Sequence, residues 1–176
     1  DFASFGLEPL VSKGKGWSRG MELFMQKKLS TTPLYGTMSL SYNKTEFTGL
    51  DEISRPGSFD QRWILNVGGG YIFNEKWQIS SRFRYATGRP YTPFQNNLRK
   101  SAELYNSARV LHNHFLDIRV DRRWFLKNIV LVTYVDIQNI YNRAPADVPR
   151  YNLFEDRIVT NASIGILPSI GISTEF

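Results

Sequence analysis

The segment from Asn113 to Asn142 constrains the fold most, because its alternating pattern predicts two long strands joined at Lys127-Asn128. Successive side chains of a strand point to opposite sides. One expected face is mainly apolar and holds Leu116, Ile118, Val120, Trp124, Ile129, Leu131, Val135 and Ile137. The opposite face is polar and holds Asp117, Arg119, Asp121, Arg123, Tyr134, Asp136 and Gln138. The segment therefore predicts a hairpin with one apolar face and one face that carries charges of both signs.

The length of these two strands points to a membrane. Each has about a dozen residues, whereas strands of soluble sheets usually have about five or six. A strand that crosses a bilayer at a tilt needs about nine to eleven residues. We therefore expect a hairpin of a transmembrane β-barrel, with its apolar face toward lipid and its polar face toward the lumen.

Composition agrees with this expectation. The chain has 176 residues, of which 41% are hydrophobic and 14% are aromatic, and its mean hydropathy is −0.34. No run approaches the roughly 18 apolar residues of a membrane-spanning helix, so a helical membrane protein is excluded. A barrel is not excluded, because half of each strand is polar, and barrels place aromatic side chains in girdles at both membrane surfaces.

Charge and residue usage disfavour other classes of function. The net charge is +6, but the basic residues are spread through the strands, so we do not expect nucleic acid as a partner. The chain has no cysteine, hence no disulfide and no thiolate metal site. His112 and His114 share strand parity without a third ligand nearby, so no metal or other cofactor is expected. No Ser-His-Asp set or paired carboxylates form a recognisable catalytic motif, which predicts a protein that is not an enzyme.

The whole chain predicts an all-β, antiparallel protein. Strands are expected at about 17–29, 34–47, 59–73, 77–88, 113–125, 129–142 and 168–176. Short turns alternate with long loops, as in barrels with short periplasmic turns and long extracellular loops, and the last strand would end at the periplasmic side. Seven strands is an odd number, and an open sheet would leave bare edges in lipid. We therefore expect residues 1–176 to be the C-terminal part of a larger barrel.

Several segments, taken in order, resemble TonB-dependent outer-membrane receptors. Arg84 to Pro93 (RYATGRPYTP), Phe59 to Arg62 (FDQR) and Leu116 to Arg123 (LDIRVDRR) are similar to segments of that family. Tyr134 to Asn142 (YVDIQNIYN) resembles its penultimate strand, and Ile170 to Phe176 (IGISTEF) resembles its closing strand with a final aromatic residue. The resemblance covers about residues 17–176.

This resemblance implies a barrel of about 22 strands that is filled by a plug domain, with this chain supplying about the last seven strands. It also implies energy-coupled uptake of a nutrient, such as an iron chelate, cobalamin, a glycan or a peptide, across the outer membrane of a Gram-negative bacterium. The implied partners are outer-membrane lipid, the plug domain and remaining barrel strands, the TonB complex through the plug, and the outer-membrane assembly machinery through the C-terminal strand. A surface lipoprotein is a further candidate partner. Because this chain holds neither a plug nor a TonB-contacting segment, it would not perform gated import alone.

Three groups of residues are candidates for function. Lumen-facing side chains, which could line a substrate route or form a ladder of cross-strand ion pairs, are Arg82, Arg84, Asp117, Arg119, Asp121, Arg123 and Asp136. Candidates for ligand contact in extracellular loops, or for ordinary loop surface, are Tyr91, Phe94, Asn96, Asn97, Arg99, Tyr105, Arg150 and Tyr151. An assembly signal, or a girdle anchor, is expected at Ile170, Ile172 and Phe176.

Two other functions stay open at this point. A passive outer-membrane porin would have a similar barrel without energy coupling, and a plug domain in the same polypeptide would distinguish the two. A soluble β-sandwich with a binding function would bury the apolar face beneath a second sheet. Partition into detergent micelles rather than buffer would argue against the sandwich.

Overall fold

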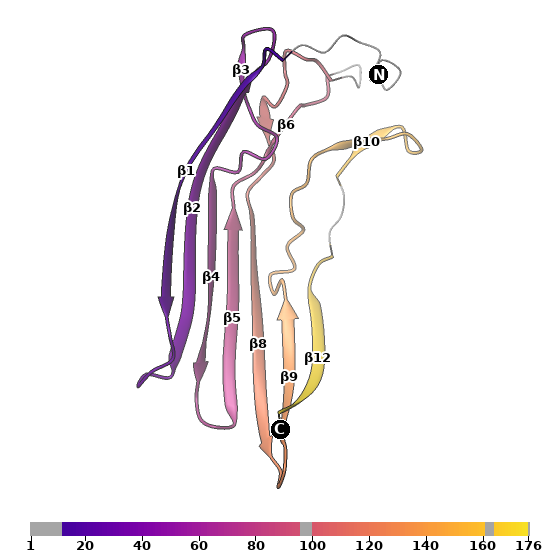
Figure 1. Ribbon diagram of the computed structural model, residues 1–176. Helices are drawn as coiled ribbons and strands as arrows, with labels where there is room; N and C mark the ends of the chain where they lie inside the picture. The colour runs from indigo at the N-terminus through magenta and orange to yellow at the C-terminus, as the bar shows by residue number, and fades with distance from the viewer. Residues whose placement is uncertain (1–11, 96–99, 161–163, 176) are drawn as a thin grey trace.

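The computed structural model of the protein describes residues 12–95, 100–160 and 164–175. One large antiparallel sheet dominates the fold, and two small antiparallel sheets lie in its loops (Figure 1). The all-β, antiparallel class predicted from the sequence is thereby confirmed. Within the described ranges, no helix is long and apolar enough to cross a membrane.

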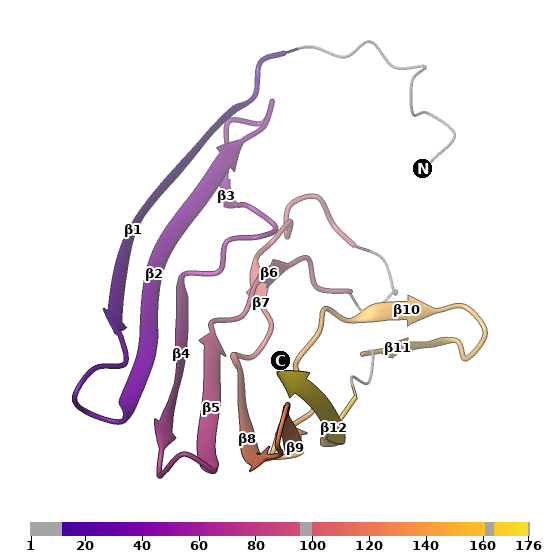
Figure 2. The ribbon, with the colours of Figure 1, turned by 60° about the horizontal axis from the view of Figure 1, so that its bottom comes forward.

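The main strands follow one another through the large sheet in chain order. They are β1 (Lys15–Lys27), β2 (Leu34–Thr48), β4 (Trp63–Ile72), β5 (Trp77–Ala86), β8 (Asn113–Phe125), β9 (Val130–Gln138) and β12 (Leu167–Glu175). The short β3 (Ser54–Pro56) pairs with β2. The small sheets join β6 (Pro90–Tyr91) to β7 (Ala108–Arg109), and β10 (Arg150–Asn152) to β11 (Arg157–Val159). The large sheet curves into an arc whose outer strands are β1 and β12 (Figure 2).

The connections divide the sheet into two ends. Short turns join β1 to β2, β4 to β5, and β8 to β9, and they lie together at the lower end in Figure 1. We name this the short-turn end. The long connections, with β3, β6, β7, β10 and β11, lie at the opposite end, which we name the long-loop end. The alternation of short and long connections therefore separates them in space.

Each strand predicted from the sequence has a counterpart, but two boundaries differ for a physical reason. The strand expected from residue 59 begins at Trp63, because the preceding Asp60 is engaged in a polar network described below. The strand expected to reach residue 142 ends at Gln138. Asn139 and Asn142 have φ angles of 52° and 51°, a left-handed conformation that asparagine tolerates and that interrupts a strand. The five short strands in the loops were not predicted.

The strand register sorts the side chains of the large sheet onto two faces. Cross-strand partners such as Met38, Val67, Phe83 and Leu116 form one continuous row. Alternation along each strand then places mainly apolar residues on this side, which we name the apolar face, and mainly polar residues on the other, the polar face. All four tryptophans of the chain, Trp17, Trp63, Trp77 and Trp124, belong to the apolar face.

The apolar face is exposed. Ile170, Ile172 and Met21 are 82%, 69% and 77% exposed, and further large side chains of this face are also accessible. Among the described residues, the only buried hydrophobic side chains are those of Ala86 and Val132. The described part of the chain thus supplies no second layer that covers the apolar face.

The polar face is bridged at one glycine. The Tyr35 hydroxyl accepts a hydrogen bond from the Gln78 amide, although these residues lie on β2 and β5 with β4 between them. The Tyr35 ring crosses Gly70 on β4, where a Cβ atom would overlap the Tyr35 hydroxyl and the backbone carbonyl oxygen of Ile79. Glycine is therefore required at position 70 for this close approach.

Candidate ligand pocket at the long-loop end

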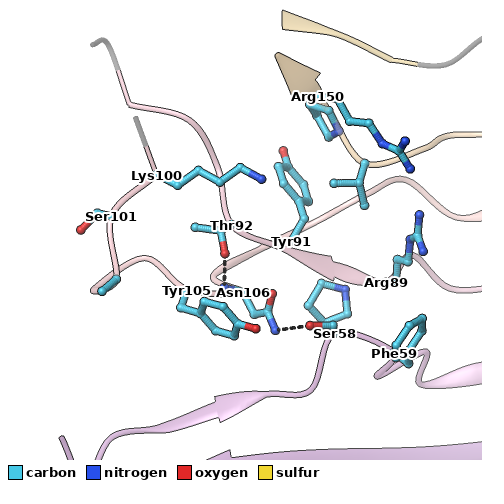
Figure 3. A pocket seen from close by; sticks show the side chains of 14 residues that line it. Ser58, Phe59, Arg89, Tyr91, Thr92, Lys100, Ser101, Tyr105, Asn106 and Arg150 are labelled. Atoms are coloured by element: carbon cyan, nitrogen blue, oxygen red, sulfur yellow. Dashed lines mark hydrogen bonds between the residues drawn. The ribbon is translucent and has the colours of Figure 1, made fainter. Parts of the chain in front are cut away.

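Three loops at the long-loop end line an open pocket of about 660 Å³ (Figure 3). They are the connections between β2 and β4, between β5 and β8, and between β9 and β12. The lining residues are Ser58, Phe59, Arg89, Pro90, Tyr91, Thr92, Lys100, Ser101, Ala102, Tyr105, Asn106, Val148, Pro149 and Arg150. A volume of this size suits a small-molecule ligand.

Asn106 fixes the floor of this pocket. Its backbone adopts a φ angle of 54°, and its backbone N–H donates to the Thr92 hydroxyl at 3.1 Å. Its side-chain amide donates to the Pro56 carbonyl oxygen at 2.8 Å and to the Ser58 hydroxyl at 3.3 Å. Asn106 is 5% exposed, so these bonds are sheltered from water. One buried side chain thereby joins the first long loop to the second (Figure 3).

The pocket is lined by cations and hydroxyl groups. Arg89, Lys100 and Arg150 line it, whereas no carboxylate is among the described residues of its lining. The Arg89 guanidinium donates to the Asp147 carboxylate at 2.7 Å, and the Lys100 ammonium lies 4.7 Å from the centroid of the Phe94 ring. The hydroxyl groups of Tyr91 and other lining residues add donors and acceptors. This set of groups suits a ligand that carries negative charge or many hydroxyl groups.

The Arg89–Asp147 pair ties the third loop to the second. The pKa of Asp147 is lowered, mainly by the hydrogen bond from the Val148 backbone N–H and also by the Arg89 guanidinium. Partial burial raises this pKa but does not outweigh them. Asp147 is therefore ionised at neutral pH and holds Arg89 at the pocket wall.

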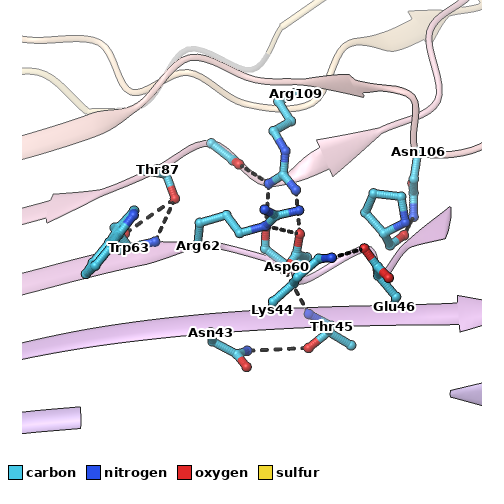
Figure 4. A network of polar contacts seen from close by, with 12 residues as sticks. Asn43, Lys44, Thr45, Glu46, Asp60, Arg62, Trp63, Thr87, Asn106 and Arg109 are labelled. Carbon is cyan, nitrogen blue, oxygen red and sulfur yellow. Dashed lines mark hydrogen bonds and ion pairs between the residues drawn. The ribbon is translucent and has the colours of Figure 1, made fainter. Parts of the chain in front are cut away.

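A buried carboxylate lies beside the pocket and holds the loops to the sheet. Asp60 is 0% exposed. It accepts hydrogen bonds from the Thr45 backbone N–H at 2.9 Å, from the Arg62 guanidinium at 2.9 Å and from the Arg109 guanidinium. Arg109 also donates to the backbone carbonyl oxygens of Asp60 at 2.6 Å and Gly88 at 3.1 Å (Figure 4). We name Asp60, Arg62 and Arg109 the loop clamp.

Asp60 remains charged in spite of its burial. Burial raises the pKa of the Asp60 carboxyl, but the Thr45 N–H, Arg62 and Arg109 together lower that pKa below its ordinary value. The same contact with Asp60 raises the pKa of Arg62. The carboxylate is thus compensated by two guanidinium groups, as a buried charge must be.

The structure distributes the predicted loop residues between several places. Tyr91, Tyr105 and Arg150 line the pocket. Phe94 lies outside the pocket lining and forms a bridge with Lys100. The Tyr151 hydroxyl donates to Asp156 within its own hairpin. Asn96, Asn97 and Arg99 lie outside the described residues.

Sequence reasoning did not assign roles to Asp60, Arg109, Asn106, Lys100 or Arg89. Asp60 and Arg89 belong to segments that carry the family resemblance, so that resemblance was the signal that could have found them. Arg109 and Asn106 lie in a stretch without a recognisable pattern. Only the path of the loops brings them to their partners.

The seven residues predicted to face a lumen all lie on the polar face. They are Arg82, Arg84, Asp117, Arg119, Asp121, Arg123 and Asp136. Arg82 and Asp117 form a cross-strand ion pair at 3.1 Å, as the expected ladder requires.

The ladder does not continue to Asp136. Arg119 binds Asp121 of its own strand at 2.6 Å, although Asp136 is its cross-strand partner. The Arg119 guanidinium also lies 3.7 Å from the centroid of the Tyr134 ring, and Arg123 pairs with Glu175 at 3.9 Å. The polar face therefore combines ion pairs within and between strands.

The residues of the predicted assembly signal lie on the last strand. Ile170 and Ile172 are on the apolar face of β12 and are exposed. Phe176 lies outside the described residues.

The two histidines lie side by side at the long-loop end of β8. Their ring centroids are 6.1 Å apart, and the Arg143 guanidinium contacts the His114 ring nitrogen. Across the described part of the chain, no group of three or more His, Cys, Asp or Glu side chains is placed to hold a metal ion.

A comparison of this chain with models of protein families, with curated proteins and with solved structures finds no match.

Proposed function

We propose that this chain is part of a transmembrane β-barrel of the bacterial outer membrane, and that the barrel takes up a nutrient as a TonB-dependent receptor does. One observation carries the membrane part of this proposal. The apolar face bears two belts of aromatic side chains with a mainly aliphatic band between them. The belt at the long-loop end holds Tyr42, Trp63, Tyr85, His114 and Tyr141, and the belt at the short-turn end holds Tyr71, Phe73, Trp77 and Trp124.

The separation of these belts fits a bilayer. Trp63 and Tyr71 on β4, and Trp77 and Tyr85 on β5, are eight residues apart, and His114 and Trp124 on β8 are ten residues apart. At about 3.3 Å per residue this is about 26–33 Å along a strand. A tilt of about 40° reduces it to about 20–25 Å, which is close to the apolar band of outer-membrane barrels.

The proposal requires further strands. In the described residues, β1 pairs only with β2, and β12 pairs only with β9. Each edge exposes unpaired backbone N–H and C=O groups. In lipid, each such group costs on the order of several kcal/mol, because it lacks a hydrogen-bond partner. Additional strands of a larger barrel would pair with both edges and remove this cost.

The pocket at the long-loop end would receive the ligand. Long loops face the outside in such barrels, and the loop clamp and Asn106 would hold this pocket in shape before ligand arrives. Its Lys100 and Arg150 favour a ligand that carries carboxylate or phosphate groups, and its tyrosines add aromatic surface for contact.

Site-directed spin labelling tests the membrane part. Because the chain has no cysteine, single cysteines at Met38 on the apolar face and Ser39 on the polar face can each carry a nitroxide label. In the full-length protein in lipid vesicles, oxygen should relax the label at position 38 and a water-soluble nickel chelate should relax the label at position 39. If neither reagent reached position 38, the apolar face would be buried in protein, as in the β-sandwich alternative.

A conductance measurement separates energy-coupled uptake from the passive porin. A receptor closed by a plug should give no stable open channel when the purified full-length protein is inserted into a planar lipid bilayer. The measurement is the single-channel current at fixed voltage, with a known porin as the positive control. A persistent open conductance would favour the porin and contradict the uptake proposal while leaving the barrel intact.

A further inference from the structure

The apolar face carries one arginine at the short-turn end, Arg122, for which the described residues supply no carboxylate partner. Arg122 lies on β8 opposite Trp77 of β5. Its guanidinium carbon is 3.7 Å from the centroid of the Trp124 ring and 5.0 Å from that of the Trp77 ring. Its Nε atom is buried and has no hydrogen-bond partner. Among the residues that the structure describes, no carboxylate forms an ion pair with Arg122.

The surroundings hold this guanidinium in place. The Trp124 indole N–H donates to the Thr133 hydroxyl at 3.0 Å, and this hydroxyl donates to the Arg122 carbonyl oxygen at 3.4 Å. The Trp124 ring is thereby fixed next to Arg122. An arginine stacked on aromatic rings still presents the N–H groups at the outer edge of its guanidinium, and their spacing matches the oxygens of a phosphate group.

A hollow on the same apolar face begins at Ile79, two residues along β5 from Trp77, which is the cross-strand partner of Arg122. It has a volume of about 740 Å³. Glycines and a serine on neighbouring strands, Gly36, Gly69 and Ser81, form its floor, and larger apolar side chains such as Tyr71 and Ile79 surround them. Ser81 is four residues along β5 from Trp77, or about 13 Å at about 3.3 Å per residue. A cation at a belt of tryptophans next to an apolar hollow is complementary to an amphiphile with an anionic head.

We propose that Arg122, with Trp77 and Trp124, binds the phosphate group of an anionic phospholipid whose acyl chain lies in the hollow. This inference rests on the proposed membrane location. Because no carboxylate of the described residues forms an ion pair with Arg122, a lipid with net negative charge binds better than a zwitterionic one. Tryptophan and arginine near the end of a membrane strand lie at the depth of lipid head groups.

Quenching of tryptophan fluorescence by brominated lipids tests this site. In the full-length protein every tryptophan except Trp77 and Trp124, including Trp17 and Trp63, is replaced by phenylalanine, so that only these two report. This protein is reconstituted in phosphatidylcholine vesicles in which brominated phosphatidylglycerol or brominated phosphatidylcholine replaces an increasing fraction of the lipid. We expect half-maximal quenching at a mole fraction of brominated phosphatidylglycerol about tenfold lower than that of brominated phosphatidylcholine. One charge-assisted hydrogen bond can supply a ratio of this size.

Variants assign the preference to Arg122. Arg122→Gln should abolish the preference for phosphatidylglycerol, and Arg122→Lys should retain only part of it, because lysine lacks the fork. Arg123→Gln is the matched control, since it removes the same charge at the neighbouring position on the polar face and should keep the preference. The heat-dependent shift in gel mobility verifies that each variant is folded.

The outcomes separate this site from the proposed function. Quenching by both lipids without a preference, or a preference that survives in Arg122→Gln, would overturn the lipid site while leaving the membrane location intact. Loss of the preference in inorganic phosphate, relative to sodium chloride at equal ionic strength, would support the site, because free phosphate would then compete with the phosphate group of the lipid. An absence of quenching by either lipid would show that the apolar face does not meet lipid, so both proposals would fail.

Discussion

Replacement of Asp60 by alanine is expected to destabilise the protein by about 3 kcal/mol or more, the cost of removing one partner from a buried ion pair. Asp60 is fully buried, and its removal leaves Arg62 and Arg109 without their carboxylate and the Thr45 N–H without an acceptor. The free energy of unfolding of the full-length protein, measured by urea titration, checks this value. Cleavage of the long loops by a protease should also become faster.

Asp51 offers the matched control. It forms an ion pair with Arg55 at 2.6 Å, but its side chain is 45% exposed, so Asp51→Ala should change stability by less than about 1 kcal/mol. Equal effects of the two substitutions would show that the loop clamp does not hold the loops.

The loop clamp also makes a prediction about pH. Because the pKa of folded Asp60 lies below its ordinary value, the charged carboxylate stabilises the fold above the unfolded pKa of about 4. This stabilisation is lost as the pH falls from there through the lowered pKa of the folded state. Asp60→Asn should therefore reduce the acid sensitivity of the protein, and an unchanged stability profile below about pH 4 would contradict the role of Asp60.

Replacement of Val67 by arginine should also cause a large loss of stability. Val67 lies midway between Trp63 and Tyr71 on the apolar face of β4. An arginine that faces lipid at the bilayer midplane costs about 2–4 kcal/mol. The expected result is a marked decrease in folded barrel in the outer-membrane fraction, measured by the heat-dependent shift in gel mobility. The free energy of unfolding in lipid vesicles should fall by the same order.

Asn66→Arg provides the comparison for this experiment. Asn66 is the neighbouring residue on the polar face, where Arg84 is already its cross-strand partner, and its substitution adds the same side chain to the same strand. We expect a loss of no more than about 1 kcal/mol, because the added arginine repels Arg84 across the strands but stays on the polar face. If Asn66→Arg were as damaging as Val67→Arg, the two faces would not differ in the way that the proposed membrane location requires.

The sequence determined the strands and their two faces. Side chains alternate along a strand because of covalent geometry, so the pattern around Ile118 and Arg119 sufficed to predict which residues share a face. One of the two alternatives for the polar-face residues was a ladder of cross-strand ion pairs, and Arg82 and Asp117 form one such pair at 3.1 Å. The ends of the strands were harder to predict. For example, β9 stops where Asn139 leaves the extended conformation.

Tertiary structure alone decided the contacts that build the pocket, the loop clamp and the arginine site. Asp60 meets Arg109, and Asn106 meets Pro56, only because the loops return to the same end of the sheet. Arg119 binds Asp121 rather than Asp136, a choice between two nearby carboxylates that alternation leaves open. Such contacts depend on the path of residues far apart in the chain, whereas the two faces of a strand depend only on the direction of neighbouring side chains.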